Sequence, residues 1–157
     1  MKYIVIDTSI VLHILRNNSV AKAILKDIAE FEEEPVLVIS SVTKGELKSF
    51  ARQRNWGSNR TKDIDTFLEN ITAVDVTFTN DDLHLVYTNI DAYSKKKAPD
   101  SSGKLLKGSA RTMGKNDLWI AATAAVTSST LLTTDKDFDH LDTVFIPVIR
   151  IDVENYR

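Results

Sequence analysis

Four acidic residues in this sequence are candidates for binding one metal ion together. They come after segments of strand or helix character: Asp7, Glu46, Asp117 and Asp135. Carboxylates that lie within a few ångströms of one another cannot all stay ionised unless a cation neutralises them. Mg²⁺ prefers oxygen ligands, and such a cation can lower the pKa of a bound water and orient it toward a phosphodiester. These residue types therefore predict hydrolysis of phosphodiester bonds by metal-activated water.

The remaining metal-ligand types in the chain do not favour a zinc site. Cysteine is absent, and the three histidines (His13, His84 and His140) show no ligand spacing. Zinc sites usually combine thiolates and imidazoles at short spacings. We therefore expect Mg²⁺ as the cofactor and interpret each histidine as a surface or core residue.

Each acid also has a purely structural interpretation, as a helix cap or a turn residue. Candidate caps are Asp7, Asn116, Asp117 and Asp135. Thr43 and Glu46 have the spacing of a capping box, and Asp137 competes with Asp135 for the role of fourth acid. Capping does not require all of these acids at one edge of a sheet. Their joint positions therefore favour a shared site.

Apolar segments of strand length alternate with segments of helical periodicity. The expected strands are Tyr3–Ile6, Val36–Ile39, Ala73–Val76, Thr130–Thr133 and Phe145–Ile149. Apolar residues at helical spacing lie between them, including a second helix marked by Val20 to Phe31 and an alanine-rich helix from Leu118 to Val126. This alternation predicts a three-layer α/β/α sandwich with a mainly parallel central sheet. Because ligands bind at the carboxyl ends of such strands, the four acids should meet there.

Length and composition favour an ordinary globular domain. The chain has 157 residues, 43% of them hydrophobic and 27% charged. We expect a single domain over 1–157. The first seven residues are too short an apolar segment for a signal peptide, and no apolar run approaches the roughly 18 residues of a membrane span. These features predict a cytoplasmic protein without a membrane anchor.

The charge of the chain is unevenly distributed. The net charge is −2, yet residues 95–115 carry seven basic side chains against one acid, Asp100. This segment is rich in Lys, Ser and Gly, so we expect a basic loop at about 94–115. Basic segments attract phosphates. The candidates for contact with the phosphates of a nucleic-acid backbone are Lys104, Lys107, Arg111 and Lys115, although a solvated loop is an equally simple interpretation of any one of them.

Four sequence blocks resemble, in order, the signature blocks of PIN-domain nucleases. The blocks are IVIDTS at 4–9, ISSVT through Glu46-Leu47 at 39–47, NDLWIAA at 116–122 and TTDKDF at 133–138. Within that family the chain is similar to the VapC-type toxins of toxin–antitoxin pairs, although its segment between Tyr93 and Asp117 is longer and more basic than expected. The resemblance implies a PIN-like fold, Mg²⁺- or Mn²⁺-dependent endoribonuclease activity, a homodimer and inhibition by a cognate antitoxin.

The resemblance also implies roles for individual residues. Asp7 and Asp117 would be the principal metal ligands. Glu46 and Asp135 would complete the acidic cluster, binding metal directly or through water. The hydroxyl groups expected to orient these carboxylates belong to Thr8, Ser9, Thr133 and Thr134.

Other functions fit the sequence less well. Haloacid dehalogenase-like phosphatases place a second Asp two residues after the first, where this chain has Ser9. The acidic pair and mid-chain acceptor of a response-regulator receiver are missing. A non-catalytic, RNA-binding PIN-like module would be expected to have lost an acid, and all four are present. A PIN-type nuclease of RNA processing or maturation stays open as the alternative to a toxin.

Overall fold

A five-stranded, fully parallel sheet forms the centre of the molecule in a computed structural model that describes residues 2–31, 33–75 and 81–156. The spatial order is β3-β2-β1-β4-β5. The strands are β1 (Tyr3–Ile6), β2 (Val36–Ser40), β3 (Thr72–Val74), β4 (Thr130–Thr133) and β5 (Val148–Arg150). The predicted α/β/α class with a parallel sheet is confirmed.

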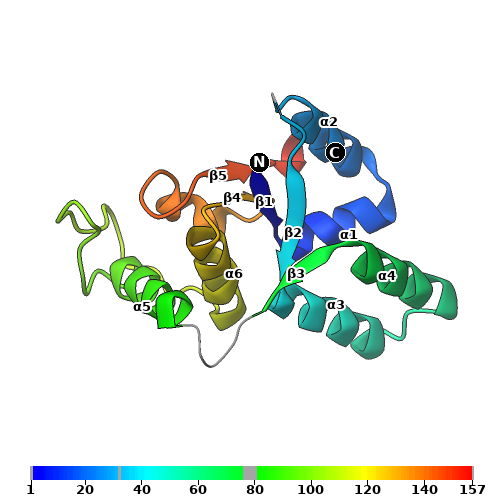
Figure 1. Ribbon diagram of the computed structural model, residues 1–157, viewed down its shortest axis with the longest axis horizontal. Coiled ribbons are helices and arrows are strands. Elements are labelled where there is room, and N and C mark those ends of the chain that lie inside the picture. Colours follow the sequence, from blue (N-terminus) through cyan, green and yellow to red (C-terminus); the bar gives the residue numbers. More distant parts are fainter. Residues whose placement is uncertain (1, 32, 76–80, 157) are drawn as a thin grey trace.

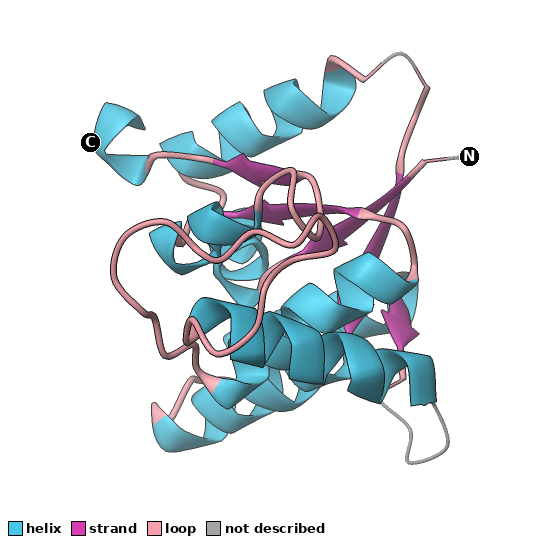
Figure 2. Ribbon diagram, turned by 90° about the vertical axis from the view of Figure 1, so that its left-hand side faces the viewer, coloured by secondary structure: helices cyan, strands magenta, loops and turns pink. Residues whose placement is uncertain are grey.

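Helices cover both faces of the sheet (Figures 1 and 2). The α-helices are α1 (Thr8–Arg16), α2 (Ser19–Ala29), α3 (Ser41–Gln53), α4 (Ser58–Asn70), α5 (Asp81–Ser94) and α6 (Lys115–Val126). Two 3₁₀ helices are η1 (Lys136–Leu141) and η2 (Val153–Tyr156). In Figure 1, α5 and α6 lie on one side of the sheet, and α1 to α4 lie on the other.

Alternating side chains of the strands build a separate core on each face. Val5 packs in the cluster that α5, α6 and η1 cover, whereas its neighbours Ile4 and Ile6 pack in the cluster of α1 to α4. All three are fully buried. In β4, Leu131 and Leu132 divide between the same two cores. A strand buried on both faces reads as a continuous apolar run, which explains why these segments show no polar alternation.

Several boundaries differ from the sequence-based expectation. The second strand ends at Ser40 rather than Ile39, and the alanine-rich helix begins at Lys115 rather than Leu118. The last strand covers Val148–Arg150 rather than Phe145–Ile149. The backbone N–H groups of Val144, Phe145 and Ile146 all turn back to the Leu141 carbonyl, which precludes a strand there. The second helix ends at Ala29 and excludes Phe31. The third strand begins one residue earlier than expected, at Thr72, and its predicted end at Val76 lies outside the described residues.

The order in which strands are added to the sheet reverses between β1 and β4, although all strands run parallel. The sequence first adds β2 and β3 on one side of β1, and then β4 and β5 on the other. The carboxyl ends of β1 and β4 therefore form the switch point at which ligands bind in open α/β sheets. Among the residues that the structure describes, no helix is both long and apolar enough to cross a membrane.

Candidate active site

Asp7 lies directly at the switch point and is held there by hydrogen bonds. Its Oδ1 accepts from the Thr8 backbone N–H at 2.7 Å, so Asp7 is the N-cap of α1. Its Oδ2 accepts from the hydroxyl groups of Ser9 at 3.1 Å and of Thr133 at 2.7 Å. Burial raises the pKa of the carboxyl group, and these three donors oppose that rise. Asp7 can thus be both the helix cap and a carboxylate of the shared site.

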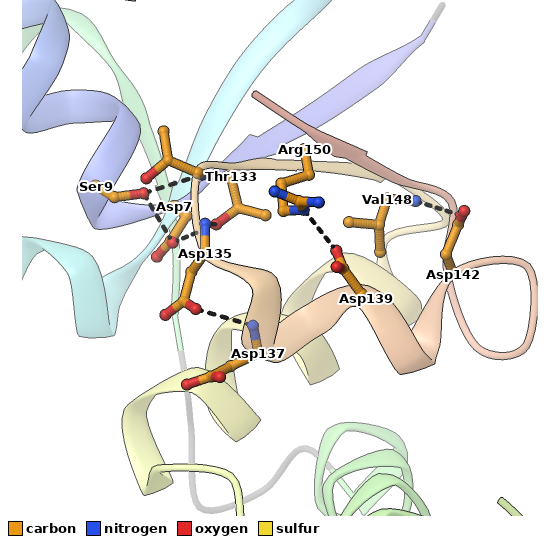
Figure 3. Close-up of polar contacts among 10 residues, drawn as sticks. Asp7, Ser9, Thr133, Asp135, Asp137, Asp139, Asp142, Val148 and Arg150 are labelled. Atoms are coloured by element: carbon orange, nitrogen blue, oxygen red, sulfur yellow. Dashed lines mark hydrogen bonds and ion pairs between the residues drawn. The ribbon is translucent and has the colours of Figure 1, made fainter. Parts of the chain in front are cut away.

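Asp135 joins the same network from the end of β4 (Figure 3). Its backbone N–H donates to the Thr133 hydroxyl at 2.9 Å, so this one hydroxyl bridges Asp7 and Asp135. The Asp135 side chain accepts from the Asp137 backbone N–H at 2.8 Å and caps η1. This turn brings the side chains of both Asp135 and Asp137 to the edge of the sheet.

Asp117 lies opposite, in the first turn of α6. Gly114 is the N-cap of this helix, so neither Asn116 nor Asp117 serves as the predicted cap. Burial, followed by the charges of the surrounding acids, raises the pKa of Asp117 to about 7. Those acids are Asp7, Asp135, Glu46 and Asp137. All four residues proposed from sequence, together with Asp137, thus lie close enough to interact electrostatically.

Three carboxylates in the described part of the chain lie close enough together to hold one metal ion: Asp117, Asp135 and Asp137. One oxygen from each lies within 4.8 Å of the others. Asp7 and Glu46 fall outside this group, so their predicted roles as metal ligands stay predictions. The sequence left open whether Asp135 or Asp137 is the fourth acid. Both place a carboxylate oxygen within 4.8 Å of one carboxylate oxygen of Asp117, and their roles as metal ligands likewise stay predictions.

Glu46 reaches the site from α3 through the α1 N-terminus. The Thr8 hydroxyl donates to Glu46 Oε1 at 2.8 Å and lies 3.1 Å from the Thr43 hydroxyl. Ser40 is the N-cap of α3, which places Glu46 beyond the first turn. The predicted capping box of Thr43 and Glu46 is therefore wrong, because the helix begins two residues before Thr43.

The donor set fits a hard divalent cation. Every group that converges here is a carboxylate, and Mg²⁺ and Mn²⁺ prefer oxygen ligands. Burial and the negative charges of the neighbouring acids raise the pKa of Asp117. A cation would relieve that repulsion, so the residues present fit the expected metal.

The remaining residues predicted from sequence occupy different surroundings. Thr8, Ser9 and Thr133 contact the acids directly, whereas Thr134 contributes its backbone N–H to the Ser9 hydroxyl at 3.3 Å. The basic candidates are all exposed: Lys104, Lys107, Arg111 and Lys115. Arg111 lines a hollow that Asp137 also lines, and Lys115 begins α6 two residues before Asp117.

Two residues near the site were not among the sequence-based candidates. Lys136 lines the same hollow as Arg111 and Asp137. Thr43 is fully buried beside Thr8. The position of Lys136 between Asp135 and Asp137 could have indicated it from the sequence. The contact of Thr43 with Thr8 depends instead on how α3 packs against α1.

Comparison with known families and structures gives a consistent result. The family model described as "PIN domain" matches residues 4–144. No curated protein matches the chain.

Several solved structures share the fold at low sequence identity. VapBC2 from Rickettsia felis, bound to a DNA fragment from their promoter, matches with a TM-score of 0.69 and 18% identity, over 96% of this chain and 99% of that chain. VapBC-1 from nontypeable Haemophilus influenzae matches with a TM-score of 0.68 and 22% identity, over 96% of this chain and 98% of that chain. VapBC-5 from Mycobacterium tuberculosis, a member of the VapBC family of toxin–antitoxin systems, matches with a TM-score of 0.58 and 21% identity, over 96% of this chain and 100% of that chain.

Proposed function

The chain belongs to the PIN domain family, and from this premise we propose that it is a Mg²⁺- or Mn²⁺-dependent endoribonuclease. The observation that carries the proposal is the meeting of Asp117, Asp135 and Asp137 at the carboxyl edge of the sheet. Such a group is costly in the absence of a cation, because like charges at this distance disfavour ionisation. Metal-assisted phosphodiester hydrolysis gives the cluster a chemical role.

Asp117, Asp135 and Asp137 would hold the metal in this mechanism, with Asp7 and Glu46 completing the site directly or through water. When bound, a divalent cation polarises a phosphodiester oxygen and lowers the pKa of a water molecule. The hydroxyl groups of Ser9 and Thr133 fix the Asp7 carboxylate. Its oxygens accept three hydrogen bonds, which leaves about one of their four acceptor positions for a ligand. The Thr8 hydroxyl orients Glu46 in the same way.

RNA is the proposed substrate, and the basic loop 95–114 supports it. An acidic site repels a polyanion unless nearby cations offset its field. Arg111 and Lys115 lie next to the acids, while Lys104 and Lys107 extend the positive charge along the exposed loop. We propose that all four contact the RNA backbone.

A toxin of a type II toxin–antitoxin system is the biological role that we propose. The support is the fold shared with members of VapBC systems over nearly the whole length of both chains. The proposal includes a cytoplasmic protein, a homodimer and a cognate antitoxin that blocks the RNA site. Growth arrest on expression of the wild-type chain, but not of Asp117→Asn, would support it. Normal growth with full nuclease activity would favour a role in RNA processing.

The test of the enzymatic proposal is cleavage of total RNA by the purified protein, with mapping of the ends. We expect cleavage in Mg²⁺ or Mn²⁺ and none in EDTA. Asp117→Asn should remain folded and inactive. Cleavage that persists in EDTA or in this variant would contradict the proposal.

A further inference from the structure

A hollow of about 400 Å³ lies directly beside the acidic cluster, between the basic loop and η1. It is lined by Arg111, Thr112, Met113, Lys136, Asp137 and Asp139. Asp137 also belongs to the three-carboxylate group. The hollow therefore opens onto the site at which a phosphodiester would be cleaved.

The loop wall of this hollow is anchored to the protein core. The Arg111 backbone N–H donates to the Ser94 carbonyl at 2.7 Å, and Met113 is 6% exposed. The Ser94 hydroxyl contacts Met113 Sδ at 3.5 Å and His140 Nε2, in η1, at 2.7 Å. Ser94 thus ties the loop wall to the η1 wall. The backbone at Arg111 has a defined place over η1 and is not an independent solvated loop.

Two cations in the hollow remain available for a ligand. Asp139 pairs with Arg150 at 3.0 Å, and Asp137 belongs to the carboxylate group. No ion pair among the described residues involves Arg111 or Lys136. The charge of Arg111 contributes, after burial, to a lowered pKa of His140, which places the guanidinium near η1. The hollow thus offers unpaired positive charge next to a negative cluster.

We propose that Arg111 and Lys136 form a subsite for the RNA phosphate adjacent to the phosphate that is cleaved. The inference rests on the proposed nuclease function. A strand whose scissile phosphate lies at Asp137 must place a neighbouring phosphate within one nucleotide of it, and the hollow shares Asp137 as a wall. A guanidinium and an ammonium group together suit a phosphate, which accepts hydrogen bonds on two oxygens. This subsite would fix the register of the strand, not merely attract it.

The first experiment measures binding of a single-stranded RNA oligonucleotide of mixed sequence, in an Asp117→Asn background that does not cleave. Adding Arg111→Ala and Lys136→Ala should weaken binding at least about tenfold at low salt. It should also flatten the slope of log affinity against log salt by about 0.7, because contact with the one phosphate that both cations bind is lost. The matched control is Lys22→Ala with Lys26→Ala, which removes two charges from α2; its affinity and slope should not change. Equal effects of the two pairs would overturn the subsite.

The second experiment uses the active protein and an oligonucleotide in which one phosphate flanking the mapped cleavage site is a neutral methylphosphonate. Neutralising the phosphate on one particular side should slow wild-type cleavage about tenfold. Arg111→Ala with Lys136→Ala should cleave the natural oligonucleotide more slowly and be insensitive to that neutral linkage, because the two changes remove the same interaction. Equal sensitivity of variant and wild type would overturn the subsite.

Failure of the subsite can be distinguished from failure of the nuclease proposal. If wild-type protein does not cleave the natural oligonucleotide in Mg²⁺ or Mn²⁺, the nuclease proposal fails. If it cleaves and the two charge substitutions change nothing, only the subsite fails. Loss of binding to a polyglutamate peptide without loss of RNA affinity would assign the hollow to an acidic protein segment and also overturn the inference.

Discussion

Asp7 and Asp117 face the same site but are stabilised in different ways. Asp7 is 5% exposed and accepts three hydrogen bonds, from Thr8, Ser9 and Thr133. Asp117 is half-buried, and no hydrogen bond to its carboxylate is found in the described part of the chain. Its pKa rises to about 7 because burial and neighbouring acids both disfavour its ionised form. Hydrogen bonds thus stabilise the carboxylate of Asp7, whereas that of Asp117 has no such donor among the described residues.

This difference indicates which half of the site depends on a cation. The Asp7 half is complete once β1 and β4 pair and α1 begins, because its donors come from the start of α1 and the end of β4. The half around Asp117, Asp135 and Asp137 gathers negative charge with few donors. Folding alone therefore positions Asp7, whereas a cation would offset the burial and the neighbouring negative charges that raise the pKa of Asp117.

The largest expected effect is that of Asp117→Asn on activity. Loss of this carboxylate should lower the cleavage rate more than about 100-fold, beyond what loss of an outer-shell partner costs a metal site. The free energy of unfolding in EDTA at pH 8 should rise, because repulsion is relieved. Asp82→Asn, in the exposed first turn of α5, is the matched control and should alter neither quantity. Destabilisation of Asp117→Asn would contradict the comparison.

Asp7→Asn should lose activity as well, but its stability should change in the opposite direction. The amide NH₂ group would face hydroxyl groups that now donate to a carboxylate, and Asp7 is buried. We expect the free energy of unfolding in EDTA to fall by about 1–3 kcal/mol, the usual cost of an unsatisfied buried group. Urea denaturation of both variants measures the contrast. A stability gain for Asp7→Asn equal to that for Asp117→Asn would show that the two acids are equivalent.

The raised pKa of Asp117 also predicts a pH dependence of metal-free stability. Between its ordinary value of 3.8 and about 7, the folded state holds a proton that the unfolded state releases. Stability from this residue must therefore fall as the pH rises through that window. His13 and His140 have lowered pKa values and act in the opposite sense near neutrality, so the measurement should be the difference between wild type and Asp117→Asn. In EDTA, that difference should grow from pH 5 to pH 8, and saturating Mg²⁺ should remove the trend.

The sequence was sufficient to predict the fold and the edge of the sheet at which the acids gather. Apolar runs such as Tyr3–Ile6 and Thr130–Thr133 carry a strong signal, because each is buried on both faces of a parallel sheet. The expected strand at Phe145 is wrong because a partly buried aromatic beside the buried Ile146 resembles a strand, while the turn that closes on Leu141 leaves no comparable pattern. Buried strands can thus be predicted from the sequence more readily than backbone turns.

The detailed grouping of the acids could not be predicted, for a geometric reason. Asp135 caps η1, and this tight turn brings Asp137 back toward Asp117. Nothing in the spacing of two residues distinguishes such a turn from an extended segment, in which the two side chains would point to the same side but the chain would not turn back toward Asp117. The position of Lys136 beside Arg111 likewise depends on the anchoring of the loop by Ser94, a contact between distant parts of the chain.

The smallest expected effect concerns the Thr133 hydroxyl, which connects the two halves of the site. It donates to Asp7 Oδ2 and accepts from the Asp135 backbone N–H. Thr133→Val keeps the shape of this fully buried side chain but removes both hydrogen bonds. We expect a loss of about 1–2 kcal/mol in stability and of about tenfold in cleavage, as for other partners that orient a metal-site carboxylate.

Two further variants separate the hydroxyl group from packing. Thr133→Ser retains the hydroxyl and removes only a methyl group, so it should retain most of the cleavage activity while still losing some stability. Thr130→Val, at the other end of β4, makes the same chemical change at a buried position away from the acids and should leave cleavage unchanged. If Thr133→Ser lost as much activity as Thr133→Val, packing at this position, not orientation of Asp7, would govern the site. Loss of cleavage activity in Thr133→Val, but not in Thr133→Ser, would show instead that the hydrogen bonds of the Thr133 hydroxyl position Asp7 and Asp135 for cleavage.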